Sequence, residues 1–287
     1  MSPEAQECLS QSVTVSQGPD GFFYGRAGQE DLYYTFFGLL LTAVTHAKIR
    51  RKDCAVKLNE VDFATLDLVH ACTWLRAKKL LRGRAMPVFL GAICEIFVNF
   101  VVQFFTTKEA RSSQTAKQSF DLTSLAALPQ HAFPQQDADS PYSRFLLGTL
   151  YTDFGLAMPV CDLDAYRLPN GLYANLKQHG EYGINATAAA LFLLPPDQCG
   201  ETADALAALQ EQDGSFKAAA SVPEGDLMST ATAAFALQRC NKSLQISPKP
   251  FLRKCFRDNG FFAATPLDPA GDLEYTAYGL LLMGMLT

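Results

Sequence analysis

Four segments of the chain share one pattern: a turn with a glycine and an aromatic residue, about a dozen further residues, an acid, and then an apolar helix. The copies lie at residues 20–44, 170–194, 213–237 and 258–286. In the last three copies the acids are Glu181, Asp226 and Asp272, which are 45 and 46 residues apart. A fixed period of this length indicates stacked helical repeats, because a single unit cannot bury its apolar face alone.

Each part of the repeat has a physical role. The turn glycine permits the backbone conformation that a tight turn needs. An acid at the start of a helix accepts hydrogen bonds from unpaired amides and complements the helix dipole. These acids are Asp31, Glu181, Asp226 and Asp272. The helices that follow are apolar almost all round, so we expect them at the centre of the protein. They cover residues 31–46, 182–194, 227–240 and 273–286.

The middle of the chain follows the pattern less clearly. Residues 54–82 read as one long amphipathic helix, and residues 86–105 and 141–156 read as two more inner helices. Inner helices would then start near residues 31, 87, 141, 182, 227 and 273. We therefore expect an all-α chain that forms a single domain over residues 1–287. A polar loop or flap at about 107–140 would cover one end of it.

Residues 86–105 are long and apolar enough to span a bilayer. However, Glu95, Asn99 and Gln103 are spaced four residues apart and therefore share one helix face. This polar stripe favours a helix that is buried among other helices and lines a cavity, with no membrane span. Burial would raise the pKa of Glu95 and allow it to act as an acid. A structural hydrogen-bond network between helices is the alternative.

Composition restricts the partners of the chain. The net charge of −5 and the lack of a basic stripe argue against nucleic acid. The first 13 residues lack the basic and apolar regions of a signal peptide. The eight cysteines are scattered, with no CxxC pair and no Cys/His spacing typical of zinc. We expect reduced thiols in a cytoplasmic protein that has no metal and no cofactor.

The first and last copies of the repeat resemble a known family. GxxDLYYTFFGLL at 28–40 and DLEYTAYGLLLM at 272–283 are similar to the prenyltransferase and squalene oxidase repeat. Class II terpenoid cyclases and protein prenyltransferase beta subunits share this repeat. The resemblance covers residues 20–46 and 165–287. It implies an (α/α)6 toroid of six inner and about six outer helices around an aromatic-lined cavity. It also leaves open whether the chain has a partner protein subunit.

The chain departs from that family at the positions that carry its chemistry. Protein prenyltransferases hold zinc with an Asp, a Cys two residues later and a His in the last repeat. Asp226 is present here, but Met228 and Tyr275 occupy the other two positions. A thioether and a phenol do not replace a thiolate and an imidazole around zinc. Class II cyclases use an Asp-x-Asp-Asp motif, and the nearest string, DLDA at residues 162–165, lacks its last acid.

The leading hypothesis is an isoprenoid- or lipid-handling protein whose apolar substrate lies in the central cavity, with metal-independent acid-catalysed cyclisation or prenyl transfer. The expected catalytic acids are Glu95, Asp31, Asp226 and Asp272. Aromatic rings can line an apolar tunnel or stabilise a carbocation. The expected substrate-binding residues are Tyr33, Tyr34, Phe37, Asn99, Gln103, Tyr182, Tyr275 and Tyr278. For each ring, the alternative is ordinary core packing. For the chain as a whole, the alternative function is a non-catalytic toroid that binds a protein or peptide.

Overall fold

The computed structural model describes residues 2–82, 137–157, 161–177 and 180–286. Within these ranges the chain is mostly helical, which confirms the all-α class. The α-helices are α1 (Pro3–Val15), α2 (Leu32–Thr45), α3 (Arg51–Glu60), α4 (Leu68–Leu81), α7 (Pro141–Asp153), α8 (Ile184–Leu193), α9 (Gly200–Ala207), α10 (Leu227–Arg239), α11 (Lys249–Cys255) and α12 (Leu273–Met285). Two short antiparallel strand pairs accompany them, namely β1 (Phe23–Tyr24) with β2 (Glu30–Asp31) and β3 (Phe262–Ala263) with β4 (Gly271–Asp272).

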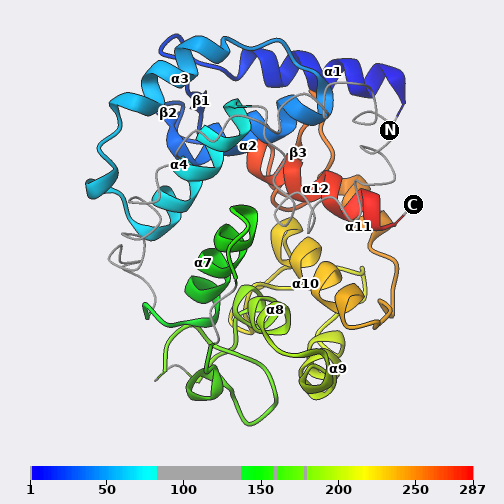
Figure 1. Cartoon of the computed structure of the whole chain (residues 1–287). Coiled ribbons are helices and arrows are strands. Elements are labelled where there is room, and N and C mark those ends of the chain that lie inside the picture. Colours follow the sequence, from blue (N-terminus) through cyan, green and yellow to red (C-terminus); the bar gives the residue numbers. More distant parts are fainter. Residues whose placement is uncertain (1, 83–136, 158–160, 178–179, 287) are drawn as a thin grey trace.

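Six of these helices pack side by side in an order that returns to its start. α2 packs on α4, α4 on α7, α7 on α8, α8 on α10, α10 on α12, and α12 on α2 (Figure 1). Other helices flank this series: α1 contacts α2, α3 contacts α4, α9 contacts α8 and α10, and α11 contacts α12. The helices predicted from the four copies of the repeat, α2, α8, α10 and α12, therefore all belong to the series.

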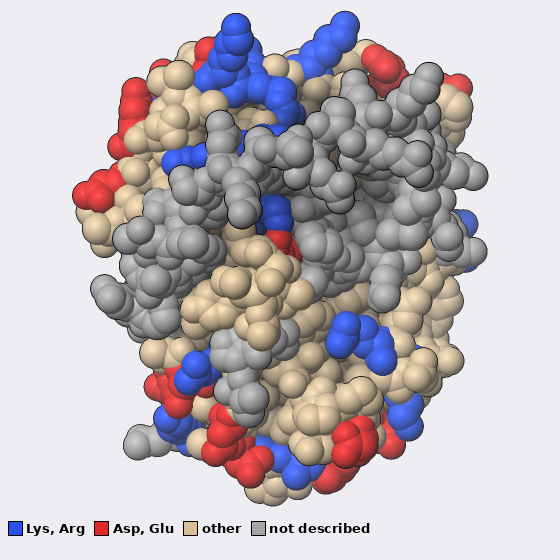
Figure 2. Space-filling model, in the orientation of Figure 1, with Lys and Arg blue, Asp and Glu red and all other residues tan. Residues whose placement is uncertain are grey.

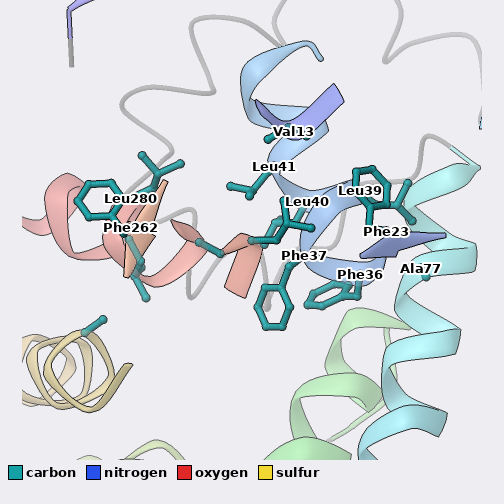
Figure 3. Packing of buried hydrophobic residues seen from close by; sticks show 14 of the residues in the cluster. Val13, Phe23, Phe36, Phe37, Leu39, Leu40, Leu41, Ala77, Phe262 and Leu280 are labelled. Carbon is teal, nitrogen blue, oxygen red and sulfur yellow. The ribbon is translucent and has the colours of Figure 1, made fainter. Parts of the chain in front are cut away.

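The two ends of the chain are joined. In α1 the Cys8 thiol donates to the Asp258 carbonyl at 3.4 Å, and the Ser12 hydroxyl donates to the Asn259 carbonyl at 2.6 Å. Buried side chains of α1, α2, α4 and α12 also share one hydrophobic cluster. Figure 3 shows members of this cluster, among them Val13, Leu41, Ala77 and Leu280. The first and last copies of the repeat thus form one continuous core.

The predicted acids cap three of the four repeat helices. Asp31, Asp226 and Asp272 each accept a hydrogen bond of 2.8 Å from the amide three residues later. The prediction is wrong for Glu181. Helix α8 begins after Gly183, which offers no side-chain cap, and the Glu181 carboxylate instead accepts from the Ser221 amide at 2.6 Å. The acid of that copy therefore ties together two neighbouring loops.

A buried threonine joins the turn to the helix in all four copies. The amide of the aromatic residue in the turn donates to the threonine hydroxyl of the following helix. The pairs are Phe23 with Thr35 at 2.9 Å, Tyr173 with Thr187 at 3.1 Å, Phe216 with Thr230 at 3.0 Å, and Phe262 with Thr276 at 2.9 Å. Each hydroxyl also donates to the carbonyl four residues earlier. The threonines are completely buried, so these bonds form without competition from water.

Replacing Thr230 by valine is expected to lower the free energy of unfolding by about 1–2 kcal/mol, because the buried Phe216 amide loses its acceptor. Valine has nearly the shape of threonine, so the loss of stability measures the contribution of the hydroxyl. Urea denaturation measures it. Thr230→Ser retains the hydroxyl and should lose less stability than Thr230→Val; equal losses in the two variants would contradict this role.

Glycines in two of the helices allow an aromatic ring to lie against the backbone. A Cβ atom at Gly38 would be 2.4 Å from the Phe23 ring, and one at Gly279 would be 2.5 Å from the Phe262 ring. Both rings are buried in the core (Figure 3). A larger side chain at either glycine would therefore have to displace a buried ring.

The middle of the chain differs from the prediction. Residues 54–82 do not form one helix but divide between α3 and α4. The reason is that Asp67 caps a new helix by accepting from the His70 amide at 2.8 Å, after a short 3-10 turn at Phe63–Thr65. α4 then lies between α2 and α7, the place expected for an inner helix at 86–105. Residues 86–105 and most of the predicted flap are outside the described ranges.

Candidate functional site

The series of six helices surrounds a cavity of about 130 Å³. All six helices, α2, α4, α7, α8, α10 and α12, contribute side chains to its wall. In α8 the contributors are Asn185, Ala188, Ala189 and Phe192, whose spacing places them on one helix face. The described wall is mainly apolar. The faces that the helices turn toward one another therefore form a hydrophobic site.

Small and large side chains together determine the size of the cavity. Ala188, Ala189 and Ala277 leave space, whereas the rings of Phe36 and Phe37 limit it. Both rings project from the same side of α2 (Figure 3). An apolar cavity of about 150 Å³ holds one benzene molecule. The cavity, which is partly open, therefore has room for a group of about five or six carbon atoms, the size of one isoprene unit.

At one end of the cavity lie three tyrosines and, beside them, an acid with a raised pKa. Tyr33 and Tyr142 lie on the wall near the starts of α2 and α7, and Tyr278 lies on the wall more than one turn into α12. The Tyr33 hydroxyl donates to the Glu274 carboxylate at 2.5 Å. Burial raises the pKa of Glu274 to about 7; the Tyr33 hydrogen bond opposes this rise, and Asp272 adds to it. Glu274 therefore exchanges its proton near neutral pH, beside the wall of an apolar cavity.

The opposite end of the cavity contains a buried ion pair. Arg76 of α4 lies on the wall, and its guanidinium donates to Asp153 at 3.1 Å and to the Thr149 hydroxyl at 2.8 Å. The side chains of Arg76 and Asp153 are only 4% and 0% exposed. Lys79 also donates to the backbone carbonyl of Asp153. These contacts fix α4 to α7 and leave the middle of the cavity apolar.

Three of the predicted catalytic acids lie outside the cavity wall. Asp31, Asp226 and Asp272 are engaged as helix caps. Burial raises the pKa of Asp226, and its hydrogen bonds with Ser229 oppose that rise. Asp272 also accepts from Arg26. Each of these carboxylates thus caps a helix, and none of them lines the cavity.

Three of the predicted substrate-binding rings, Tyr33, Phe37 and Tyr278, lie on the cavity wall. Three others do not belong to it. The Tyr34 ring contacts Tyr33 edge-on, Tyr182 packs against the core around α8, α9 and α10, and the Tyr275 ring lies beneath Arg26 at 5.0 Å. Glu95, Asn99 and Gln103 are outside the described residues.

The sequence interpretation missed Glu274 and the pair of Arg76 with Asp153. A signal for Glu274 was present, since it precedes Tyr278 by one helical turn and shares its face. No comparable signal marked the ion pair, because its partners are 77 residues apart. Only the packing of α4 on α7 brings them together.

No protein-family model, curated protein or solved structure matches the chain. Within the described ranges, no three His, Cys, Asp or Glu side chains gather as they would around a metal ion. None of the described helices combines the length and apolar character needed to cross a lipid bilayer. On the face in Figure 2, charges of both signs lie mostly toward the upper and lower edges, and uncharged residues occupy much of the described middle.

Proposed function

We propose that the chain forms an (α/α)6 toroid that binds an isoprenoid-like apolar molecule in its central cavity. The observation that carries this proposal is the apolar wall to which each of the six serial helices contributes. The return of the helix contacts from α12 to α2 supports a closed ring. The likeness of the first and last repeats to the prenyltransferase and squalene oxidase repeat supports the class of ligand. The cavity volume suits one isoprene unit or the end of a longer chain.

For catalysis we assign the acid to Glu274 in place of the capping aspartates. A carboxyl group with a pKa of about 7 supplies a proton most efficiently near neutral pH. Its route to the ligand leads through Tyr33. When Glu274 is protonated, its carboxyl becomes the donor of the bond to Tyr33; the carboxyl proton then passes to the Tyr33 oxygen while the Tyr33 hydroxyl proton passes to a ligand alkene. The products are a Glu274 carboxylate and a tertiary carbocation. The rings of Phe37 and Tyr278 on the same wall would stabilise the cation.

Filling the cavity tests the proposed binding site. Ala188→Phe places a ring in the enclosed space, and we expect it to weaken the binding of geraniol, a two-unit isoprenoid alcohol, at least tenfold. Isothermal titration calorimetry measures the affinity. Ala205→Phe in α9 is the matched control, because Ala205 is also partly buried but does not line the cavity.

Retained binding in Ala188→Phe, or loss of the same size in Ala205→Phe, would place the ligand elsewhere. If the unaltered protein binds no isoprenoid and releases none on solvent extraction, the cavity is only a packing feature. That result would favour the non-catalytic alternative, a module that binds a protein or peptide.

A further inference from the structure

Tyr278 lines the cavity and carries a hydroxyl that has no hydrogen-bond partner among the described residues. Among the described residues, Glu30 Oε2 is the one fully buried side-chain oxygen or nitrogen without a hydrogen-bond partner, so the Tyr278 hydroxyl is not a fully buried atom. The Tyr278 hydroxyl therefore retains accessible surface, and its position on the wall directs that surface toward the cavity. A buried hydroxyl in this state is ready to donate to a ligand.

The oxygen of Tyr33 can accept a hydrogen bond from a ligand. Its proton is engaged with Glu274, but a phenol oxygen can accept a hydrogen bond at the same time. Tyr33 also lies on the wall. Phe37 contacts both tyrosines: its ring centroid is 5.1 Å from that of Tyr33 and 6.2 Å from that of Tyr278. One donor and one acceptor thus lie on neighbouring parts of an otherwise apolar surface.

The charges at this end of the cavity disfavour an anion. Helix N-termini attract phosphate when their amides are free, but one amide in the first turn of each of α2, α10 and α12 already bonds to Asp31, Asp226 or Asp272, and these carboxylates repel an anion. Glu274 adds a further acidic group beside Tyr33. The nearby cation, Arg26, is engaged with Asp268 at 2.8 Å and with Asp272. A diphosphate placed at this end would meet carboxylates and a cation that is already engaged with them; the arginines on the cavity wall, Arg76 and Arg239, lie in the C-terminal halves of α4 and α10.

We infer that the ligand of the cavity is an uncharged alcohol whose hydroxyl accepts from Tyr278 and donates to the Tyr33 oxygen, while the first isoprene unit of its hydrocarbon chain occupies the apolar space. This inference rests on the proposed function and narrows its ligand class. A ketone would use only the Tyr278 donor, and a plain hydrocarbon would use neither group. A prenyl diphosphate would bring its charge toward Glu274.

Three compounds with one carbon skeleton test the inference: geraniol, the hydrocarbon 2,6-dimethyl-2,6-octadiene and geranyl diphosphate. In competition binding at pH 7.5 we expect geraniol to bind about five- to tenfold more tightly than the hydrocarbon, a gain that two neutral hydrogen bonds of modest net strength provide together. Geranyl diphosphate should bind at least tenfold more weakly than geraniol. Tyr278→Phe should reduce the preference for the alcohol, because only the Tyr33 acceptor remains, and should leave the affinity for the hydrocarbon unchanged. Tyr24→Phe, at an exposed strand position, is the control and should change neither.

The outcomes separate the two proposals. Equal affinity for alcohol and hydrocarbon, an unchanged preference in Tyr278→Phe, or tighter binding of the diphosphate would overturn the inference and leave the apolar cavity as the binding site. If none of the three compounds binds, the proposed function itself fails and the inference fails with it.

Discussion

Replacing Asp153 by asparagine is expected to lower the free energy of unfolding by about 3–5 kcal/mol, because it leaves the buried Arg76 guanidinium without its carboxylate. The two side chains are almost completely buried, so water cannot take over the lost interaction. The pair also joins α4 to α7 at the end of the cavity. Urea denaturation at pH 7 measures the loss, which should be visible as a lower midpoint with little change in slope.

The same substitution at an exposed ion pair provides the control. Asp204 contacts Lys242 at 2.6 Å, with side chains 67% and 39% exposed. Asp204→Asn should cost less than about 1 kcal/mol, because solvent screens exposed pairs. If Asp153→Asn were no more destabilising than Asp204→Asn, the ion pair between α4 and α7 would not hold the helices together.

Replacing Glu274 by glutamine is expected to remove a pH dependence of up to about 3 kcal/mol from the folding equilibrium. The pKa of Glu274 is raised from 4.5 to about 7 in the folded protein, and each unit corresponds to about 1.4 kcal/mol. Below about pH 4.5 the carboxyl is protonated in both states. As the pH rises toward 7, the unfolded state loses this proton first, so the free energy of unfolding falls. Above pH 7 the fall is complete.

Glu274→Gln cannot ionise, so it should match the unaltered protein near pH 4.5 and exceed it in stability at pH 8. Urea denaturation at both pH values tests this expectation. Glu60→Gln, at an exposed carboxylate near the end of α3, should leave the pH dependence in place. A pH profile of Glu274→Gln that is parallel to that of the unaltered protein would show that Glu274 is not the group with the raised pKa.

Much of the fold could be predicted from local signals. An acid followed by an apolar stretch located α2, α10 and α12, and the Asp caps confirm the reason. The same rule failed at Glu181 because two extended residues follow it and α8 begins only after Gly183. It also overlooked Asp67, which ends the supposed long helix by starting a new one. Cap residues report a helix start reliably only when the helix follows them directly.

The candidate site was less accessible to prediction. Tyr33, Phe37 and Tyr278 were recognised as rings on apolar helices, and they lie on the cavity wall. The capping aspartates were expected to act in catalysis, but their carboxylates face the helix amides. The acid whose pKa is raised to about 7 is Glu274, two residues after a cap. Side-chain direction within the first helical turn decides between these roles, and the repeat pattern alone does not contain it.

The sequence by itself determined the repeat, its turns, three of its caps and the apolar helices at the centre, because these depend on residues within about 20 positions of one another. Only the tertiary structure decided which helix packs on which and what lines the space between them. Burial and charge at Glu274 and Arg76 arise from neighbours distant in the chain, namely Tyr33 and Asp153. A pKa or an ion pair depends on distance in space, and the chain must fold before those distances exist.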